Sequence, residues 1–242
     1  ALALTDHGTM FGTVEFFNSA IEAGIKPIIG LETYLSPRKM TDRDPRRDKR
    51  AFHLLLLAEN MDGYQNLLKI ASASQLEGFY YRPRIDREYL KNHSDGLIVT
   101  SGCLSGDIPR ALHNNDIGRA EKALAWYLDV FGRDRFFLEL QSHNIQGLEQ
   151  TNQRLVDLGN RHNVKFIASN DVHYINKEDS RLQDILLAIQ TGSLLADPER
   201  MRMGDDTYYL RTPEEMKNLF GHVPGAIENT LMIAERCQVD LT

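Results

Sequence analysis

Short apolar segments recur along this chain, and side chains that can bind metals stand where those segments end. The segment at 164–168 is followed, after two polar residues, by Asp171-Val172-His173. A short apolar run bounded by polar residues is typical of a buried strand in a parallel sheet. If the strand reaches His173, the side chains of Asp171 and His173 point to one side at its carboxyl end, where α/β folds place their chemistry. Such a pair can chelate a divalent metal. The alternative is a hydrogen-bonded pair at a loop entrance.

Strand-like and helix-like segments alternate through the first 174 residues. Strands are expected at 1–5, 25–35, 54–58, 97–100, 136–140 and 164–168, and helices at 13–23, 61–74, 117–131 and 148–162. After Tyr174 only helices are expected, at 179–191, 213–220 and 224–237. Asp62 and Thr212 are the predicted N-caps of two helices, and Pro224 the first residue of the last. The alternation predicts a single α/β domain over 1–242, with a mostly parallel sheet closed into a barrel and a helical part at 175–242.

Composition excludes some classes of protein. Of the 242 residues 42% are hydrophobic and 26% charged, which is typical of a soluble globular chain. The net charge of −6 argues against a free-standing nucleic-acid binder, so any nucleic-acid contact must be local or be supplied by another domain. Two cysteines cannot form a disulfide scaffold, so we expect a cytoplasmic setting. No apolar run approaches the roughly 18 residues of a membrane span. The chain starts without Met and inside an apolar strand, so an N-terminal piece is expected to be missing.

Side chains that bind metals gather at the expected strand ends. They are Asp6, His7, Glu32, His53, Cys103, His143, Asp171 and His173. The carboxyl ends of parallel strands in a barrel converge on one rim, so these residues can meet although they are distant in sequence. Mixed imidazole, carboxylate and thiolate ligands suit Zn²⁺, with Mn²⁺ or Fe as substitutes where oxygen ligands dominate. His53 fits least well, because it stands at the start of its apolar run and not at the end.

These motifs resemble those of the polymerase and histidinol phosphatase (PHP) domain family, specifically the N-terminal PHP domains of bacterial replicative DNA polymerase III alpha subunits. The similarity extends over nearly the whole chain. It is carried by Thr5-Asp6-His7-Gly8, by Asn170-Asp171-Val172-His173 and by the segments 53–72, 101–112, 135–143, 170–192 and 208–237. The resemblance implies a distorted seven-stranded β/α barrel whose rim binds a multinuclear metal cluster. It also implies DNA replication as the process and phosphoester hydrolysis as the ancestral chemistry.

The family's ligand positions fall on six residues of this chain. They are His7, Glu32, His53, Cys103, Asp171 and His173. The resemblance further implies a His-x-His segment and an Asp that precede the first residue of this sequence. Glu32 and Asp171 are the expected catalytic residues, since a carboxylate can bridge two metal ions about 3.5–4 Å apart. Asp6 and His143 are expected next to the ligands or next to substrate, and Cys237 in the core.

Two basic segments are candidate DNA contacts. The segment 38–50 holds seven positive and three negative side chains. It either guides a DNA strand to the rim or is a solvated loop that contacts the rest of a polymerase. The segment 79–84 interleaves aromatic and basic residues, as single-strand binders do, and Arg82 and Arg84 are its candidate phosphate contacts. A fixed structural loop is the alternative for this segment.

Three functions remain open from the sequence. The favoured one is a metal-dependent 3′–5′ proofreading exonuclease, because all six ligand positions keep ligating residues. The second is a structural platform that docks a separate proofreading subunit, and the third is a small-molecule phosphatase. The expected partners are the 3′ end of a DNA primer strand, the remaining polymerase domains and, through the resemblance, a separate exonuclease subunit and a sliding clamp.

Overall fold

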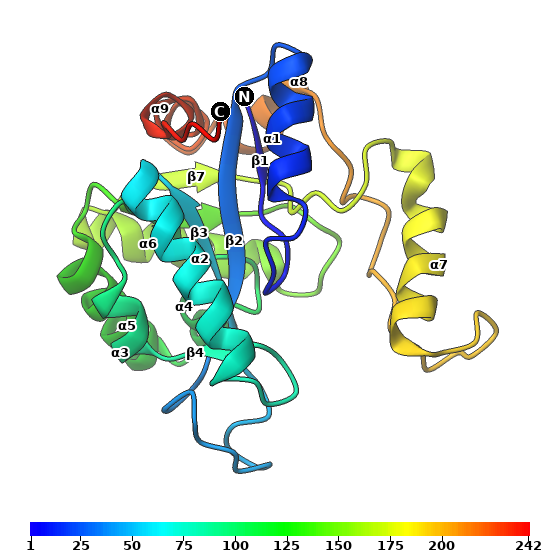
Figure 1. Cartoon of the computed structure of the whole chain (residues 1–242), viewed down its shortest axis with the longest axis horizontal. Helices are drawn as coiled ribbons and strands as arrows, with labels where there is room; N and C mark the ends of the chain where they lie inside the picture. Colours follow the sequence, from blue (N-terminus) through cyan, green and yellow to red (C-terminus); the bar gives the residue numbers. More distant parts are fainter.

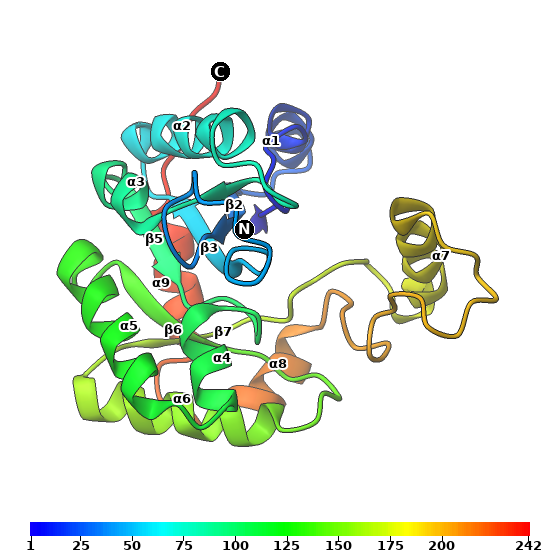
Figure 2. The same ribbon diagram turned by 90° about the horizontal axis from the view of Figure 1, so that it is seen from below.

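Seven strands form one curled sheet, and most of the helices cover its outer side (Figures 1 and 2). The computed structural model describes residues 1–242. The strands are β1 (Leu2–Leu4), β2 (Pro27–Leu35), β3 (Phe52–Ala58), β4 (Arg84–Ile85), β5 (Leu97–Thr100), β6 (Phe136–Leu140) and β7 (Phe166–Ala168). Their order is β1-β2-β3-β5-β6-β7, and the short β4 pairs with β2. The sheet is a half-barrel, so the α/β fold of barrel type is confirmed.

One strand runs against the others, and its direction matters for the candidate site. The pairs β1–β2, β5–β6 and β6–β7 are parallel, as expected, but β3 is antiparallel to both β2 and β5. The amino end of β3 therefore lies at the same rim as the carboxyl ends of its neighbours. This explains why His53 stands at the start of its apolar run and still belongs to that rim.

The expected helices between strands are confirmed. The helices are α1 (Thr13–Glu22), α2 (Met61–Leu76), α3 (Arg87–Asn92), α4 (Asp107–His113), α5 (Ile117–Phe131), α6 (Leu148–His162), α7 (Ser180–Thr191), α8 (Pro213–Phe220) and α9 (Glu228–Arg236), with a 3-10 turn η1 (Lys177–Asp179). The predicted N-cap Asp62 is wrong, because the side chain of Asn60 accepts the hydrogen bond from Gly63 N at 3.0 Å. Thr212 is the N-cap of α8, as predicted. The last helix begins at Glu228 and not at Pro224.

The strands bury one face against the outer helices and turn the other toward the hollow of the half-barrel. In β3, Phe52, Leu54 and Leu56 are buried in the main hydrophobic core, whereas His53 and Leu55 are partly exposed on the opposite face. This alternation is the period of two expected of a strand. Burial of each such Leu side chain contributes roughly 1.5–3 kcal/mol. The core thus lies behind the sheet, and polar side chains are free to gather in front of it.

The loop at 36–50 between β2 and β3 is held from inside the molecule. Arg84 is fully buried and donates to the backbone carbonyls of Gly78, Asp48, Met40 and Asp42 at 2.9–3.1 Å. The guanidinium of Arg38 binds both carboxylate oxygens of the buried Asp48, at 2.9 and 2.6 Å. Because these contacts fix the backbone, the other cations of the loop project from an ordered scaffold.

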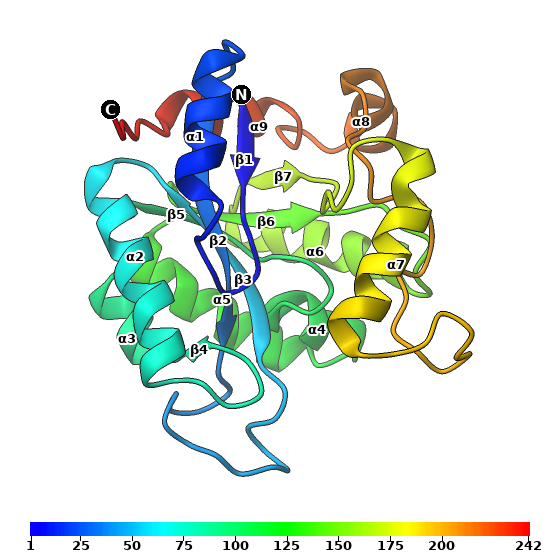
Figure 3. The same ribbon diagram turned by 45° about the vertical axis from the view of Figure 1, so that its right-hand side comes forward.

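Only helices follow Tyr174, as the sequence predicts. Helix α7 stands apart from the body of the molecule (Figures 1 and 2), and Figure 3 views the molecule with α7 in front. Its residues Leu182, Leu186 and Ile189 are exposed. No helix is both long enough and apolar enough to cross a membrane.

Candidate metal centre

Three side chains from the first three strands meet in the hollow of the half-barrel. His7 follows β1 and forms an isolated bridge with Glu32 of β2, and His53 begins β3. The possible ligand atoms of these three residues all lie within 4.8 Å of one another. Nδ1 of His7 is 3.4 Å from Oε1 of Glu32, and Nδ1 of His53 contacts the same oxygen. The buried carboxylate is therefore the middle of the group.

Sheet pairing accounts for this arrangement. Tyr34 lies opposite His53 in the β2–β3 register, and Glu32 lies two residues before Tyr34, so all three side chains share one face. The backbone beyond β1 is tied to β2 by hydrogen bonds from Glu32 N to Asp6 O (3.1 Å) and from Gly8 N to Glu32 O (2.9 Å). These bonds carry the chain past the end of β1 and bring His7 to Glu32.

Cys103 joins the group from the turn after β5. Its Sγ lies 3.6 Å from Nδ1 of His53. The preceding Gly102 has φ +70°, and a Cβ there would lie 3.3 Å from the carbonyl oxygen of His53. Glycine permits both this left-handed turn and the close approach to β3, and so it allows the thiol to reach the imidazole.

Asp171 and His173 complete the group, but not from a strand. β7 ends at Ala168, and Asp171 has φ 45°, so the expectation that the strand extends to His173 is wrong. The left-handed backbone of Asp171 itself, and not a continuous strand, accompanies the approach of the two side chains: Nδ1 of His173 is 3.9 Å from Oδ1 of Asp171. The rings of His173 and His7 are 5.9 Å apart. The six predicted ligand positions thus lie in one cluster, which we call the six-residue cluster.

Burial and mutual charge set the protonation of this cluster. Burial alone would raise the pKa of Glu32, but the close contacts with the imidazoles of His53 and His7 outweigh it and lower the pKa to about 2. The contact with Glu32 raises the pKa of His7, and burial opposes it. Burial raises the pKa of Asp171, while nearby His173 opposes this and Glu32 adds to it. For Cys103, burial raises the pKa well above its usual range, with Glu32 and Asp171 adding to it.

These donors fit a divalent metal. Oε1 of Glu32 is buried and has no hydrogen bond of good geometry, although two imidazole nitrogens face it. Two carboxyl groups and a thiol lie in this cluster, and a bound cation would stabilise the deprotonated form of each of them. Imidazole, carboxylate and thiolate together are the donors that Zn²⁺ takes in proteins.

The other predicted site residues lie at different distances from the cluster. His143 stacks on Tyr208, with ring centres 3.9 Å apart, and Tyr208 meets the ring of His173 edge-on at 5.6 Å. Burial lowers the pKa of His143 to about 4, so it is neutral at pH 7. Asp6 contributes its backbone carbonyl to Glu32, and its carboxylate lies beside Gly12 at the start of α1.

The two arginines of the segment 79–84 differ. Arg82 is exposed, and its guanidinium lies 5.9 Å from the ring centre of Tyr34, which puts it near the cluster. Arg84 is buried, and its guanidinium donates its hydrogen bonds to backbone carbonyls, so it is not available to bind a phosphate. A structural role for Arg84 replaces the expected phosphate contact. Cys237 is buried in a small apolar cluster, as predicted.

Sequence reasoning did not single out Tyr34 and Tyr208. Tyr34 could have been found from its position two residues after Glu32 in the same strand, because such residues share a face. Tyr208 comes from the segment between α7 and α8 and reaches the cluster only through the tertiary fold, since His173 N donates to its carbonyl oxygen at 2.9 Å. No local pattern signals that contact.

Comparison with known proteins gives a consistent assignment. Residues 1–143 match the PHP domain family. The DNA polymerase III subunit alpha of Borreliella burgdorferi is 46% identical over 98% of this chain and 21% of its own length. That of Thermus aquaticus is 45% identical over 100% of this chain and 20% of its own length, and that of Treponema pallidum 42% over 99% and 20%. The chain thus spans about a fifth of the length of the curated relatives that it matches. It belongs to the PHP domain family, among the PHP domains of DNA polymerase III alpha subunits.

Proposed function

We propose that this domain is a metal-dependent phosphoesterase that serves a DNA polymerase III alpha subunit as a 3′–5′ proofreading exonuclease. The observation that carries the proposal is the convergence of six side chains of ligating type around the buried carboxylate of Glu32. A protein that had lost this chemistry would have little reason to keep two buried carboxyl groups and a thiol together. Under the same proposal, the partners of the domain are the rest of the polymerase and the 3′ end of a primer, and its location is the cytoplasm.

The residues have separable roles in this proposal. His7, Glu32, His53, Cys103, Asp171 and His173 would hold the metal, with Zn²⁺ the best match and Mn²⁺ or Fe as substitutes. Bound there, a divalent ion would supply Lewis-acid stabilisation of the charge that develops on a phosphate. Glu32 and Asp171 would compensate the charge of the metal, and Arg82 stands near enough to orient a phosphodiester beside the cluster.

The test uses the complete alpha subunit with Asp171 and His173 both replaced by Ala. The double variant should bind less metal, because two ligands on one side of the cluster are lost. The rate at which it removes a 3′-mismatched primer nucleotide should fall by at least about a hundredfold. Its polymerase activity should stay close to that of the unchanged subunit. Metal content and primer shortening are measured in the absence of any other exonuclease.

The matched control is Asp157→Ala with His162→Ala, which removes the same two side-chain types from helix α6. It should change neither metal content nor primer shortening. Unchanged metal in the Asp171 and His173 variant would reject the ligand assignment. Metal loss with undiminished primer shortening would reject the exonuclease and favour the platform for a separate proofreading subunit.

A further inference from the structure

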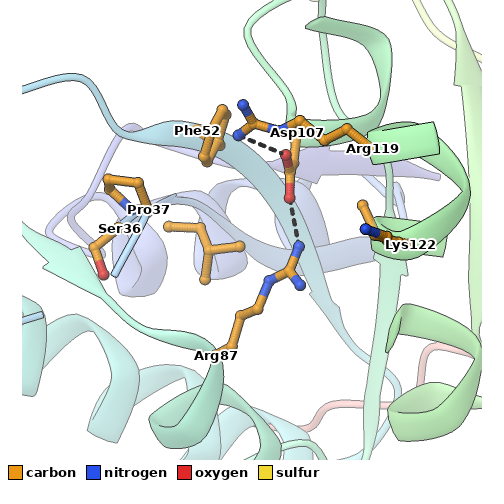
Figure 4. Close-up of a pocket in the computed structure, with 9 residues that line it drawn as sticks. Ser36, Pro37, Phe52, Arg87, Asp107, Arg119 and Lys122 are labelled. Atoms are coloured by element: carbon orange, nitrogen blue, oxygen red, sulfur yellow. Dashed lines mark hydrogen bonds and ion pairs between the residues drawn. The ribbon is translucent and has the colours of Figure 1, made fainter. Parts of the chain in front are cut away.

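A polar cavity lies on the opposite side of the sheet from the six-residue cluster. Its volume is about 230 Å³. Leu35 and Phe52 form part of its wall, and Arg87, Arg119 and Lys122 surround it with Asp107 (Figure 4). Phe52 and His53 are consecutive in β3, and the alternation of a strand sends one side chain to this cavity and the other to the cluster.

The cations of the cavity are held in fixed positions. Arg87 and Arg119 reach Asp107 from two sides, at 2.5 and 3.4 Å, and Asp107 is only 5% exposed (Figure 4). The guanidinium of Arg87 also lies 4.9 Å from the ring centre of Trp126. Lys122 is exposed and has no ion-pair partner. Three positive side chains against one carboxylate leave an excess of positive charge, and the two arginines remain 37% and 52% exposed.

The loop at 36–50 continues this positive surface. Ser36 and Pro37 line the cavity, and the loop returns to β3 at Phe52. Arg110 marks the junction: its guanidinium lies 4.8 Å from the ring centre of Phe52. Burial lowers the pKa of Arg110, Cys103 opposes this, and the charges of Arg50 in the loop and Arg119 in the cavity lower the pKa further. Arg110 therefore lies near a cation of the loop and a cation of the cavity.

We call this surface the basic face. It consists of Arg43, Arg46, Arg47, Lys49, Arg50, Arg87, Arg119 and Lys122, all but Arg87 and Arg119 without a carboxylate partner. The basic face is positively charged, although the whole chain has a net charge of −6. The anchoring of the loop by Arg84 presents these cations at a low cost in conformational entropy.

We propose that the basic face binds the phosphodiester backbone of a DNA strand and passes it over the rim toward the six-residue cluster. The loop at 36–50 joins the carboxyl end of β2 to the amino end of β3, so it stands at the rim between the cavity on one face and His53 on the other. Many cations spread along one loop match a polymer that carries a charge at every unit. A compact acidic peptide would need only the few cations around the cavity.

The proposal rests on the proposed function for the identity of its ligand, but its test is separate. In the complete subunit, Arg47 and Lys122 are both changed to Glu, and binding of a fluorescent single-stranded oligonucleotide is measured over a series of salt concentrations. Affinity at low salt should fall about tenfold, and the dependence of log affinity on log salt should become shallower by about one to two, because two phosphate contacts are lost. Metal content should be unchanged.

The matched control is Lys69→Glu with Arg181→Glu, two exposed cations of helices α2 and α7, which contribute no residue to the basic face. It should leave affinity and salt dependence unchanged. Arg47→Ala with Lys122→Ala, which introduces no negative charge, should give a smaller loss in the same direction. Equal behaviour of the basic-face and control variants would overturn the proposal. So would displacement of the oligonucleotide by a poly-glutamate peptide that binds more tightly than DNA. Loss of binding in a subunit without nuclease activity would support the basic face and reject only the exonuclease.

Discussion

Glu32 shows how one residue can be held charged inside a protein. Burial favours its neutral form, yet two imidazoles at 3.4 Å or closer reverse that preference and keep the carboxylate ionised. Cys103 has no such pair of imidazoles, since the one ring that its thiol contacts, that of His53, also contacts Glu32. The thiol is therefore protonated near neutral pH until a metal displaces its proton.

Replacement of Cys103 tests this difference. Cys103→His should keep a measurable fraction of the bound metal, because imidazole also binds Zn²⁺, whereas Cys103→Ser should lose most of it. In the unchanged protein, metal affinity should rise with pH, because binding must release the thiol proton. Metal content of the complete subunit over a pH series checks both points.

Cys237→Ser is the control for that experiment. It removes a thiol from the apolar cluster with Ile233, so it should lower the melting temperature and leave metal content unchanged. If the Ser and His variants of Cys103 held the same amount of metal, Cys103 would be a packing residue and not a ligand.

At the scale of elements, local sequence patterns predicted most strands and helices but not the direction in which each strand runs. The apolar segment of β3 could be predicted from its four leucines, and its antiparallel direction could not, because direction depends on which strands it pairs with. The left-handed backbone of Asp171 was likewise hidden, since even Asp adopts this conformation at only a minority of its positions. The six ligand positions could still be listed through the family motifs, because those motifs survive such changes in local geometry.

Arg84 anchors an element that has no regular structure of its own. Arg84→Met should destabilise the domain by about 3 kcal/mol, because several buried carbonyls would lose their donor. The loop at 36–50 should then become accessible to trypsin at its exposed cations while the sheet stays intact. Thermal unfolding and limited proteolysis measure the two effects. Arg82→Met, at an exposed neighbour, should change neither, and equal proteolysis of both variants would show that the loop is held by other contacts.

At the scale of the whole molecule, the six-residue cluster joins distant parts of the half-barrel. Its members follow β1, lie in β2 and β3, and follow β5 and β7. The edge strands β1 and β7 do not pair with each other, so no backbone hydrogen bond closes the sheet between them. His7 and His173, with ring centres 5.9 Å apart, face each other across this opening.

A metal bound at the cluster should therefore stabilise the fold as well as serve its chemistry. Because the ligands come together only in the folded state, a metal at about a thousand times its dissociation constant adds about 4 kcal/mol to the free energy of unfolding. Dialysis of the complete subunit against a chelator should lower the unfolding temperature of this domain, and return of Zn²⁺ should restore it. The variant with Asp171 and His173 replaced by Ala should respond to neither treatment, whereas the Asp157 and His162 control should respond to both. An unfolding temperature that the chelator leaves unchanged, in a protein shown to have lost its metal, would mean that the cluster does not tie the half-barrel together.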